Sequence, residues 1–383
     1  MRTLITATLM FAFVALPFAQ AAERAFPTVV THADVLAKYQ AALSGGEKVK
    51  VLLMPGHEPS YGGAVLGDIK ERDLMVDVAN KMAVELRKDP ALEVTVARDQ
   101  LAWNEELSEY FEEEWEDIEK FVAGKKKTMQ RAIRKGDVTV RDFEPAHNVA
   151  ATDVALRLYG VTKWANDEGY DLVLHLHLND TGAQNHQGFA VYVPDYQFGN
   201  AEASRALGEA IAYELNQFSA SSTLPIENYG IVEDQSLIAL GAYNTAELPS
   251  VLVEYAYIYE QKIKNMEARD AVLSDMAYQT VQGMQEYLGA PLLSDKTLSL
   301  PYAWTIGGPE KGKSSAEAYA LQVALLKLGF FPGAGNLLIT CPLTGVMDTC
   351  TTNALNAFQA SKGWTPTGAI GPMTKAALAA AGF

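Results

Sequence analysis

The chain has 383 residues, of which 49% are hydrophobic and 20% charged, as in globular proteins and unlike disordered chains. It carries 47 acidic and 31 basic side chains, and its net charge of −16 argues against nonspecific nucleic-acid binding, because such a surface repels phosphates. Two cysteines exclude a four-cysteine zinc site, an iron–sulfur cluster and a dense disulfide framework, so any metal site must use mainly histidines and carboxylates. The length predicts two or three domains.

The first 21 residues are typical of an export signal. Arg2 precedes an apolar stretch over 4–16, and residues 19–21 form a small-x-small cleavage site. The apolar run is shorter than the roughly 20 residues that a bilayer requires. We therefore expect cleavage after Ala21, no membrane span in the mature protein, and a secreted or periplasmic location, where disulfides persist.

Strand and helix patterns alternate through the following part of the chain. Apolar runs bounded by turn residues predict strands, and apolar residues at helical spacing predict helices. The expected elements, in order, are a strand over 49–54, a helix over 70–87, a strand over 92–97, a helix over 153–166, strands over 171–178 and 188–193, a helix over 202–215, a strand over 250–256 and a helix over 265–287. This alternation favours an α/β fold with a mostly parallel sheet flanked by helices.

A strongly charged segment, at about 104–145, interrupts the alternation. Residues 105–119 contain nine acidic side chains and no basic one, and residues 120–135 contain seven basic side chains and no acidic one. Its apolar residues follow helical spacing and Gly124 offers a turn, so we expect a helical hairpin whose halves pair. The segment is either a solvated surface decoration or a lid near the active site.

The C-terminal part differs in composition. Residues 291–313 are rich in Pro, Gly, Ser and Lys and predict a linker. The tail over 314–383 contains a weak repeat, in which a Thr-Gly pair at Thr344 and its following residues recur 23 positions later. Each unit is typical of a turn followed by a helix, so we expect a small helical domain. A small exported domain has little core, and we expect Cys341 and Cys350 to form a disulfide rather than remain free thiols.

Three features that can carry chemistry occur where predicted strands meet loops. His57 follows a Pro-Gly turn, His175 and His177 share one strand face, and Glu254 lies near the end of an apolar strand. Each feature also has a purely structural interpretation. His57 can be an ordinary loop histidine, His175 and His177 can be structural residues of a strand, and Glu254 can pair with an arginine. Together they resemble a catalytic zinc site with an open position. The HExxH signature of many zinc proteases is absent from the sequence.

The order of the motifs resembles that of zinc-dependent N-acetylmuramoyl-L-alanine amidases. The matching segments are VLLMPGHEPSYGGAVLGDIKERDL, VTVARD, LHLHLND, GFAVYV and SVLVEYAYI, which together extend over roughly residues 48–288. The resemblance implies that His57, Glu71 and His177 bind Zn²⁺ and that Glu254 is the catalytic carboxylate. It also implies hydrolysis of the amide bond between the lactyl carbonyl of N-acetylmuramic acid and L-alanine.

The chain departs from this family in three places. The loop after His57 reads Glu-Pro-Ser-Tyr over 58–61, where the family has more Gly and Asp. His175 stands where the family usually has Ser, and it is a candidate for supporting a ligand, contacting substrate or replacing a ligand. The charged insertion is also atypical of the family.

The tail resembles three-helix peptidoglycan-binding domains. The matching segments are LQVALLKLGFFPG, TGVMDTCTTNALNAFQASKGW and TGAIGPMTKAAL, although Thr344 and Thr367 replace the family's usual Asp before Gly. The expected organisation is therefore a zinc amidase domain over 22–290, a linker over 291–313 and a peptidoglycan-binding domain over 314–383. The sequence gives no prediction of the oligomeric state. The alternatives are another secreted zinc amide hydrolase, carboxypeptidase-like, on the peptide stem, and a non-catalytic cell-wall-binding protein.

Overall fold

The structure is a computed structural model that describes residues 25–141, 152–291, 304 and 308–383. The predicted export signal over 1–21 lies outside the described residues, as do most of the predicted linker and the end of the charged insertion. Within the described ranges, the structure contains no helix that is both long and apolar enough to cross a membrane.

A six-stranded sheet forms the centre of the first part of the chain, in the order β4-β1-β5-β8-β6-β7. Strands β1, β4, β5 and β8 are parallel, whereas β6 pairs antiparallel with β8 and parallel with β7. This confirms the predicted mostly parallel sheet. The strand bounds are β1 Val49–Pro55, β4 Leu92–Val96, β5 Leu172–Asn179, β6 Ala190–Pro194, β7 Ile231–Asp234 and β8 Ser250–Tyr257, and β2 Val65–Leu66 and β3 Ile69–Lys70 form a separate hairpin.

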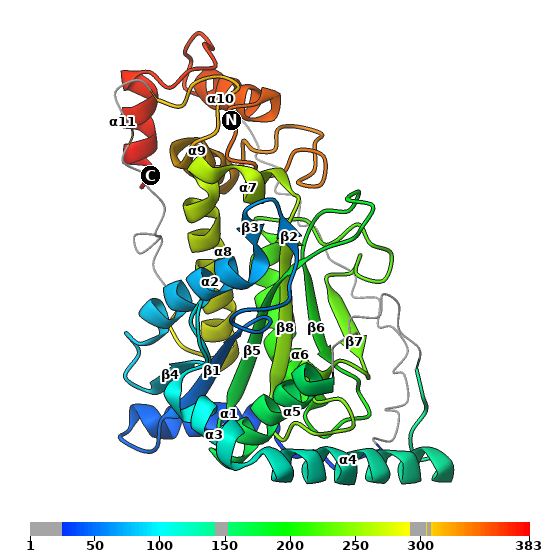
Figure 1. Ribbon diagram of the computed structural model, residues 1–383. Helices are drawn as coiled ribbons and strands as arrows, with labels where there is room; N and C mark the ends of the chain where they lie inside the picture. The colour runs from blue at the N-terminus through cyan, green and yellow to red at the C-terminus, as the bar shows by residue number, and fades with distance from the viewer. Residues whose placement is uncertain (1–24, 142–151, 292–303, 305–307) are drawn as a thin grey trace, which may run out of the picture.

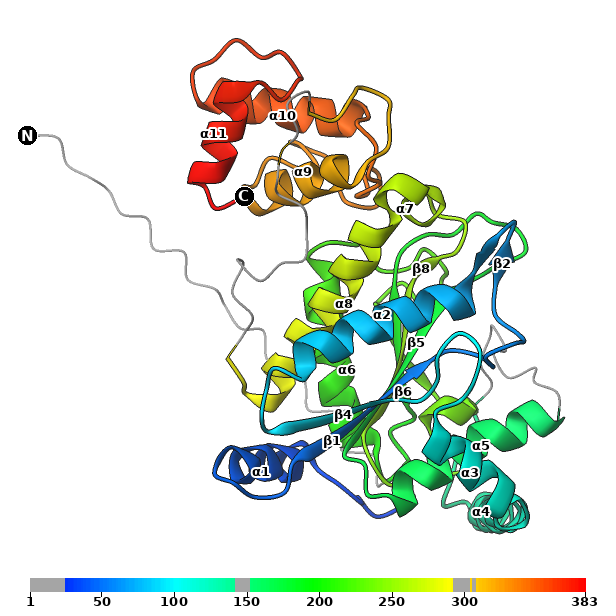
Figure 2. The same ribbon diagram turned by 60° about the vertical axis from the view of Figure 1, so that its left-hand side comes forward.

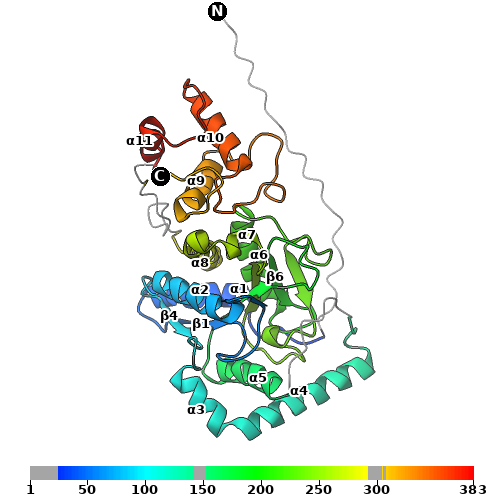
Figure 3. The same cartoon turned by 45° about the horizontal axis from the view of Figure 1, so that its top comes forward.

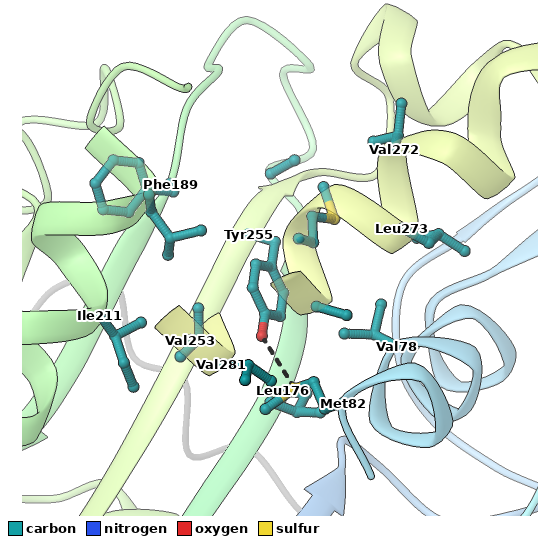
Figure 4. Close-up of a cluster of buried hydrophobic side chains, with 14 of the residues drawn as sticks. Val78, Met82, Leu176, Phe189, Ile211, Val253, Tyr255, Val272, Leu273 and Val281 are labelled. Atoms are coloured by element: carbon teal, nitrogen blue, oxygen red, sulfur yellow. Dashed lines mark hydrogen bonds between the residues drawn. The ribbon is translucent and has the colours of Figure 1, made fainter. Parts of the chain in front are cut away.

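Helices cover both faces of the sheet (Figures 1 and 2). One layer contains α1 His32–Leu43, α2 Glu71–Leu86, α6 Ala201–Asn216 and α8 Met266–Leu288, and the opposite layer contains α5 Thr152–Asp167 and a short 3-10 helix, Ile238–Leu240. The even-numbered leucines of β5 pack in the first layer's core (Figure 4). Because side chains alternate along a strand, His175 and His177 point to the opposite face, on the side of α5.

The charged insertion is not the predicted hairpin. It forms α3 Glu105–Glu113 and α4 Trp115–Lys135, which meet at Glu114, and α4 continues through Gly124 without a break (Figure 3). A glycine inside a helix costs only about 1 kcal/mol, and packing of the apolar stripe offsets this cost: Ile118 and Val122 are buried in the core beside α5. The acidic and basic halves therefore do not pair as predicted.

Three helices form the C-terminal tail, α9 Ala316–Lys327, α10 Thr349–Ser361 and α11 Pro372–Ala380. A disulfide joins Cys341 to Cys350, as predicted. The weak sequence repeat has a physical basis in two buried glutamines. Gln322 accepts a hydrogen bond from the Gly345 N–H (2.9 Å) and donates one to the Thr351 hydroxyl (2.7 Å). Gln359 makes the equivalent bonds with Gly368 (3.2 Å) and Thr374 (3.1 Å), which lie 23 positions after Gly345 and Thr351.

The tail packs directly on α8 (Figure 1). The buried Tyr319 hydroxyl of α9 donates to the buried carboxylate of Asp275 on α8 (2.7 Å). The Asn265 amide donates to the Thr344 carbonyl (2.8 Å), and one hydrophobic cluster includes side chains from both the sheet layer and the tail. The tail and the sheet-containing part are therefore one packed unit rather than two modules joined by a linker alone.

Gly345 offers a test of this docking. Its φ is +73°, and an added Cβ would lie 2.4 Å from the Cβ of Ala268 on α8. Gly345→Ala should therefore lower the free energy of unfolding by about 2–5 kcal/mol, through left-handed strain and overpacking together. Gly363 is the matched control, since its φ is +76° and an added Cβ would meet nothing within 4 Å. Gly363→Ala should lose only about 1–2 kcal/mol. Equal losses in denaturant unfolding would contradict the docking.

Candidate metal and catalytic site

A cavity of about 730 Å³ lies at the carboxyl edge of the sheet. In parallel sheets this edge gathers the loops that carry functional side chains. The cavity is lined by every residue that the sequence singled out, namely His57, Glu71, His175, His177 and Glu254. No described residue of the charged insertion lines it, so the structure supports the surface interpretation of that segment over the lid.

His57 reaches the cavity through a tight turn at the end of β1. Gly56 is required there, because a Cβ at this position would lie 2.4 Å from the ring of His177. His57 itself has a φ of 70°, a left-handed conformation that is uncommon for residues other than glycine. Backbone strain of this kind persists where the surroundings enforce it, often at functional sites. Here it places the imidazole next to Glu71.

Glu71, the first residue of α2, joins the two imidazoles. Its Oε2 lies 3.0 Å from Nε2 of His57 and accepts from the Ala64 N–H (2.7 Å). Its Oε1 lies 3.0 Å from Nδ1 of His177 and accepts from the Leu178 N–H (3.0 Å). Burial raises the pKa of this carboxyl, but the charge and hydrogen bonds of His57 and His177 outweigh burial and hold the pKa below its usual value. Glu71 is therefore an anionic group despite its burial.

These three side chains fit a metal ion. One ligand atom from each of His57, Glu71 and His177 lies within 4.8 Å of the other two. Each histidine has one ring nitrogen 3.0 Å from one Glu71 oxygen, Oε2 for His57 and Oε1 for His177, close to the roughly 3.3 Å between ligands of a tetrahedral zinc ion with bonds of about 2.0–2.1 Å. Two imidazoles and a carboxylate are also a common ligand set for zinc.

Glu254 lies beside this cluster on the neighbouring strand. Glu254 on β8 pairs with His177 on the adjacent parallel strand β5. The side chain is buried, lines the cavity, and leaves Oε2 with no hydrogen-bond partner among the described residues. Burial, and then repulsion from Glu71 and Glu227, raises the pKa of Glu254 well above its usual value. The shift moves the pKa toward neutral pH, the direction that favours a group which both accepts and delivers a proton.

His175 lines the same cavity but does not join the cluster of three. It is 2% exposed, and burial lowers its pKa to about 3, with a smaller contribution from His177. His175 is therefore a neutral imidazole in the cavity wall.

Arg98 holds the two ligand-bearing segments together, a role that the sequence did not reveal. The buried guanidinium donates to the carbonyls of Pro55 (3.1 Å) and Gly56, just before His57. It also donates to the carbonyl of Arg72 (3.0 Å), just after Glu71. Burial lowers the pKa of Arg98 to about 10, so the side chain stays charged at neutral pH. One charged group thus fixes both segments through main-chain acceptors.

A second unpredicted group is Glu227, a fully buried carboxylate behind the cavity wall. It accepts hydrogen bonds from the Asn179 amide (2.9 Å) and from the hydroxyls of Tyr192 (2.6 Å) and Tyr257 (2.9 Å). Asn179 and Tyr192 line the cavity. Glu227 therefore joins the ends of β5 and β8 to the middle of β6 beside the site.

Comparison with known proteins identifies the two parts of the chain. Residues 131–286 match the family described as N-acetylmuramoyl-L-alanine amidase. Residues 314–378 match a peptidoglycan binding domain. The chain contains an amidase domain joined to a peptidoglycan-binding domain. The amidase domain is that of an enzyme that hydrolyses an amide bond in peptidoglycan, and the family match includes His177 and Glu254 but begins after His57 and Glu71.

Several solved amidase structures are similar to the chain. The N-acetylmuramyl-L-alanine amidase Ami1 from Mycobacterium smegmatis is 17% identical, with 63% of this chain and 98% of that chain covered and a TM-score of 0.43. The amidase AmiC2 of Nostoc punctiforme is 18% identical, with 64% and 99% covered and a TM-score of 0.39. No curated protein matches the chain.

Arg98 can be tested by truncation. Arg98→Ala leaves the carbonyls of Pro55, Gly56 and Arg72 without their charged donor, so the free energy of unfolding should fall by at least about 3 kcal/mol. The control is Arg87→Ala, which removes an exposed arginine with one hydrogen bond, to the Val94 carbonyl, and should cost about 1 kcal/mol. Denaturant unfolding compares the two, and similar losses would argue against a special role for Arg98.

Proposed function

We propose that the amidase domain is a zinc enzyme in which His57, Glu71 and His177 hold the metal and Glu254 transfers protons. The observation that carries this proposal is the convergence of three ligand side chains beside a buried carboxylate with an unpartnered oxygen. Three protein ligands leave one position of a tetrahedral zinc ion open, the arrangement of catalytic rather than structural sites. When bound, zinc lowers the pKa of a coordinated water and polarises a carbonyl.

The chain's own residues supply the remaining chemistry. Glu254 accepts a proton from the attacking water and delivers it to the leaving amine, which its raised pKa and position beside His177 favour. Glu71 contacts one ring nitrogen of each histidine, through Oε2 for His57 and Oε1 for His177, and so holds both imidazoles beside one carboxylate. His175 stays neutral in the cavity wall and contacts substrate or supports the ligands.

The bond that we propose is the amide between the lactyl carbonyl of N-acetylmuramic acid and L-alanine. The family description names this bond, and the cavity at the carboxyl ends of the strands contains the proposed ligands and Glu254. We propose a catalytic domain over 22–290, a linker over 291–313 and a wall-binding domain over 314–383. The export pattern of residues 1–21 and the disulfide support a secreted or periplasmic enzyme.

Two variants separate the metal-binding role from the proton-transfer role. His177→Ala leaves two protein ligands, so zinc per chain, measured by elemental mass spectrometry, should fall together with activity. Glu254→Gln keeps the size of the side chain but removes the base. Zinc should then stay near one per chain while turnover drops by roughly 10²–10⁴-fold.

His175→Ala is the control, since His175 shares a strand face with His177. It should keep its zinc. Zinc loss in His175→Ala but not in His177→Ala would place the ligand two residues away from the proposed one. Full activity in Glu254→Gln would show that Glu254 does not transfer the proton.

Product analysis tests the bond itself. The purified full chain, incubated with sacculi, should release stem peptides that begin with a free L-alanine amine and leave lactyl carboxylates on the glycan. Mass spectrometry identifies both ends, and a chelator should abolish their release. Release of a single C-terminal amino acid instead would indicate a carboxypeptidase, and absence of any product would indicate a wall-binding protein without activity.

A further inference from the structure

A second cavity, of about 380 Å³, lies where the tail meets the amidase domain. The amidase domain contributes residues 184–187 and 259–262, and the tail contributes residues 342–344. The two sides are tied together beside the cavity, because the Gln187 amide donates to the Ile339 carbonyl (2.7 Å) and the Asn265 amide donates to the Thr344 carbonyl (2.8 Å). We call this cavity the junction groove, and neither part of the chain forms it alone.

The polar side chains of the junction groove include two without partners. Gln184 and Asn185 line the groove as exposed residues and make no side-chain hydrogen bond with other described residues, so their amides are free to exchange bonds with water for bonds with a ligand. Gln184 has a φ of 49°, the left-handed region, and its N–H bonds to the Thr181 carbonyl (2.8 Å). This strained turn presents two amides, each of which can donate and accept, to the groove.

The charges in the junction groove are compensated within the protein. Glu260 accepts from the N–H groups of Gly188 and Tyr257 (both 2.9 Å), and its other oxygen lies 3.6 Å from Nζ of Lys262. The aromatic ring of Tyr259 also lines the groove, and its hydroxyl bonds to Thr181 (2.7 Å). Amides, an aromatic ring and no free charge suit a neutral ligand rich in hydroxyl and amide groups, such as an N-acetylated sugar, better than a charged peptide.

The junction groove is connected to the catalytic cavity by one loop. Asp180 lines the catalytic cavity, and Gln184, four residues later, lines the groove. Glu254 of β8 lines the catalytic cavity, and Tyr259, two residues after the end of β8, lines the groove. Two short segments, 180–184 and 254–259, therefore each contribute residues to both cavities.

We propose that the junction groove binds the glycan strand of peptidoglycan, beside the unit whose stem peptide is cleaved. This inference rests on the proposed function, since it names where the same substrate extends. It also gives the docked tail a role: the tail completes a binding site at a fixed distance from the catalytic cavity, instead of acting as a free tether.

The experiment measures binding of a hexamer of N-acetylglucosamine to the full chain by isothermal titration calorimetry. The hexamer carries no stem peptide, so its binding does not depend on hydrolysis. The double variant Gln184→Ala with Asn185→Ala should bind at least tenfold more weakly than the unmodified chain. The matched control, Gln40→Ala with Gln130→Ala, removes two exposed amides on α1 and α4 and should bind like the unmodified chain.

Equal binding by both double variants, or no binding by the unmodified chain, would overturn the proposal. Hydrolysis of a small soluble muropeptide by the unmodified chain, followed in parallel, tests the proposed function separately. If the unmodified chain cleaves the muropeptide but the groove variant binds the hexamer as tightly as the unmodified chain, the proposed function stands and the proposed role of the junction groove is wrong.

Discussion

The Glu71 carboxylate lies between two imidazoles, and the rest of the site is arranged to keep it there. Its two oxygens face His57 and His177 and also accept main-chain N–H bonds from Ala64 and Leu178. A buried anion without such partners would be costly. Gly56 lets the β1 turn approach His177 because it has no side chain. Arg98 joins that turn to the start of α2 by donating to carbonyls on both segments, those of Pro55, Gly56 and Arg72. The cluster thus depends on groups that do not belong to it.

The same constraint explains where the substrate reaches the enzyme. The three residues that we propose as metal ligands come from the end of β1, the start of α2 and the end of β5, all at one edge of the sheet. The tail docks beyond this edge through Tyr319 and Asp275, two buried partners on α9 and α8 (Figure 1). The amidase domain and the peptidoglycan-binding domain therefore pack against each other through a shared hydrophobic cluster.

Local patterns in the sequence predicted much of the fold. The apolar strands and the long helices were found within a few residues, because burial on a sheet or helix face leaves a clear period. Short edge strand β7 (IVED) was missed, because two of its four residues are acidic and it lies at the edge of the sheet. Helix α1 was also missed, although its capping box, formed by Thr31 and Asp34, was visible in the sequence. The turn predicted at Gly124 is wrong, since tertiary packing of α4 outweighs glycine's weak helix propensity.

The candidate site was accessible from the sequence only in part. His57, His177 and Glu254 stand at strand ends, where function is expected, and Glu71 was found through the family resemblance alone. Arg98 and Glu227 act through contacts with segments more than 25 residues away, such as the Arg98 bond to Pro55 and the Glu227 bonds to Asn179 and Tyr192. No local pattern reveals such contacts.

We propose that one metal ion lies between His57, Glu71 and His177. Anomalous X-ray diffraction at the zinc absorption edge, on crystals of the zinc-loaded protein, tests it most directly. We expect a single strong peak at about 2.0–2.2 Å from one nitrogen of each histidine and from a Glu71 oxygen, with Glu254 next to the ion but not bound to it. A peak bound to His175 in place of His177, or to Glu254 in place of Glu71, would contradict the proposed ligand set.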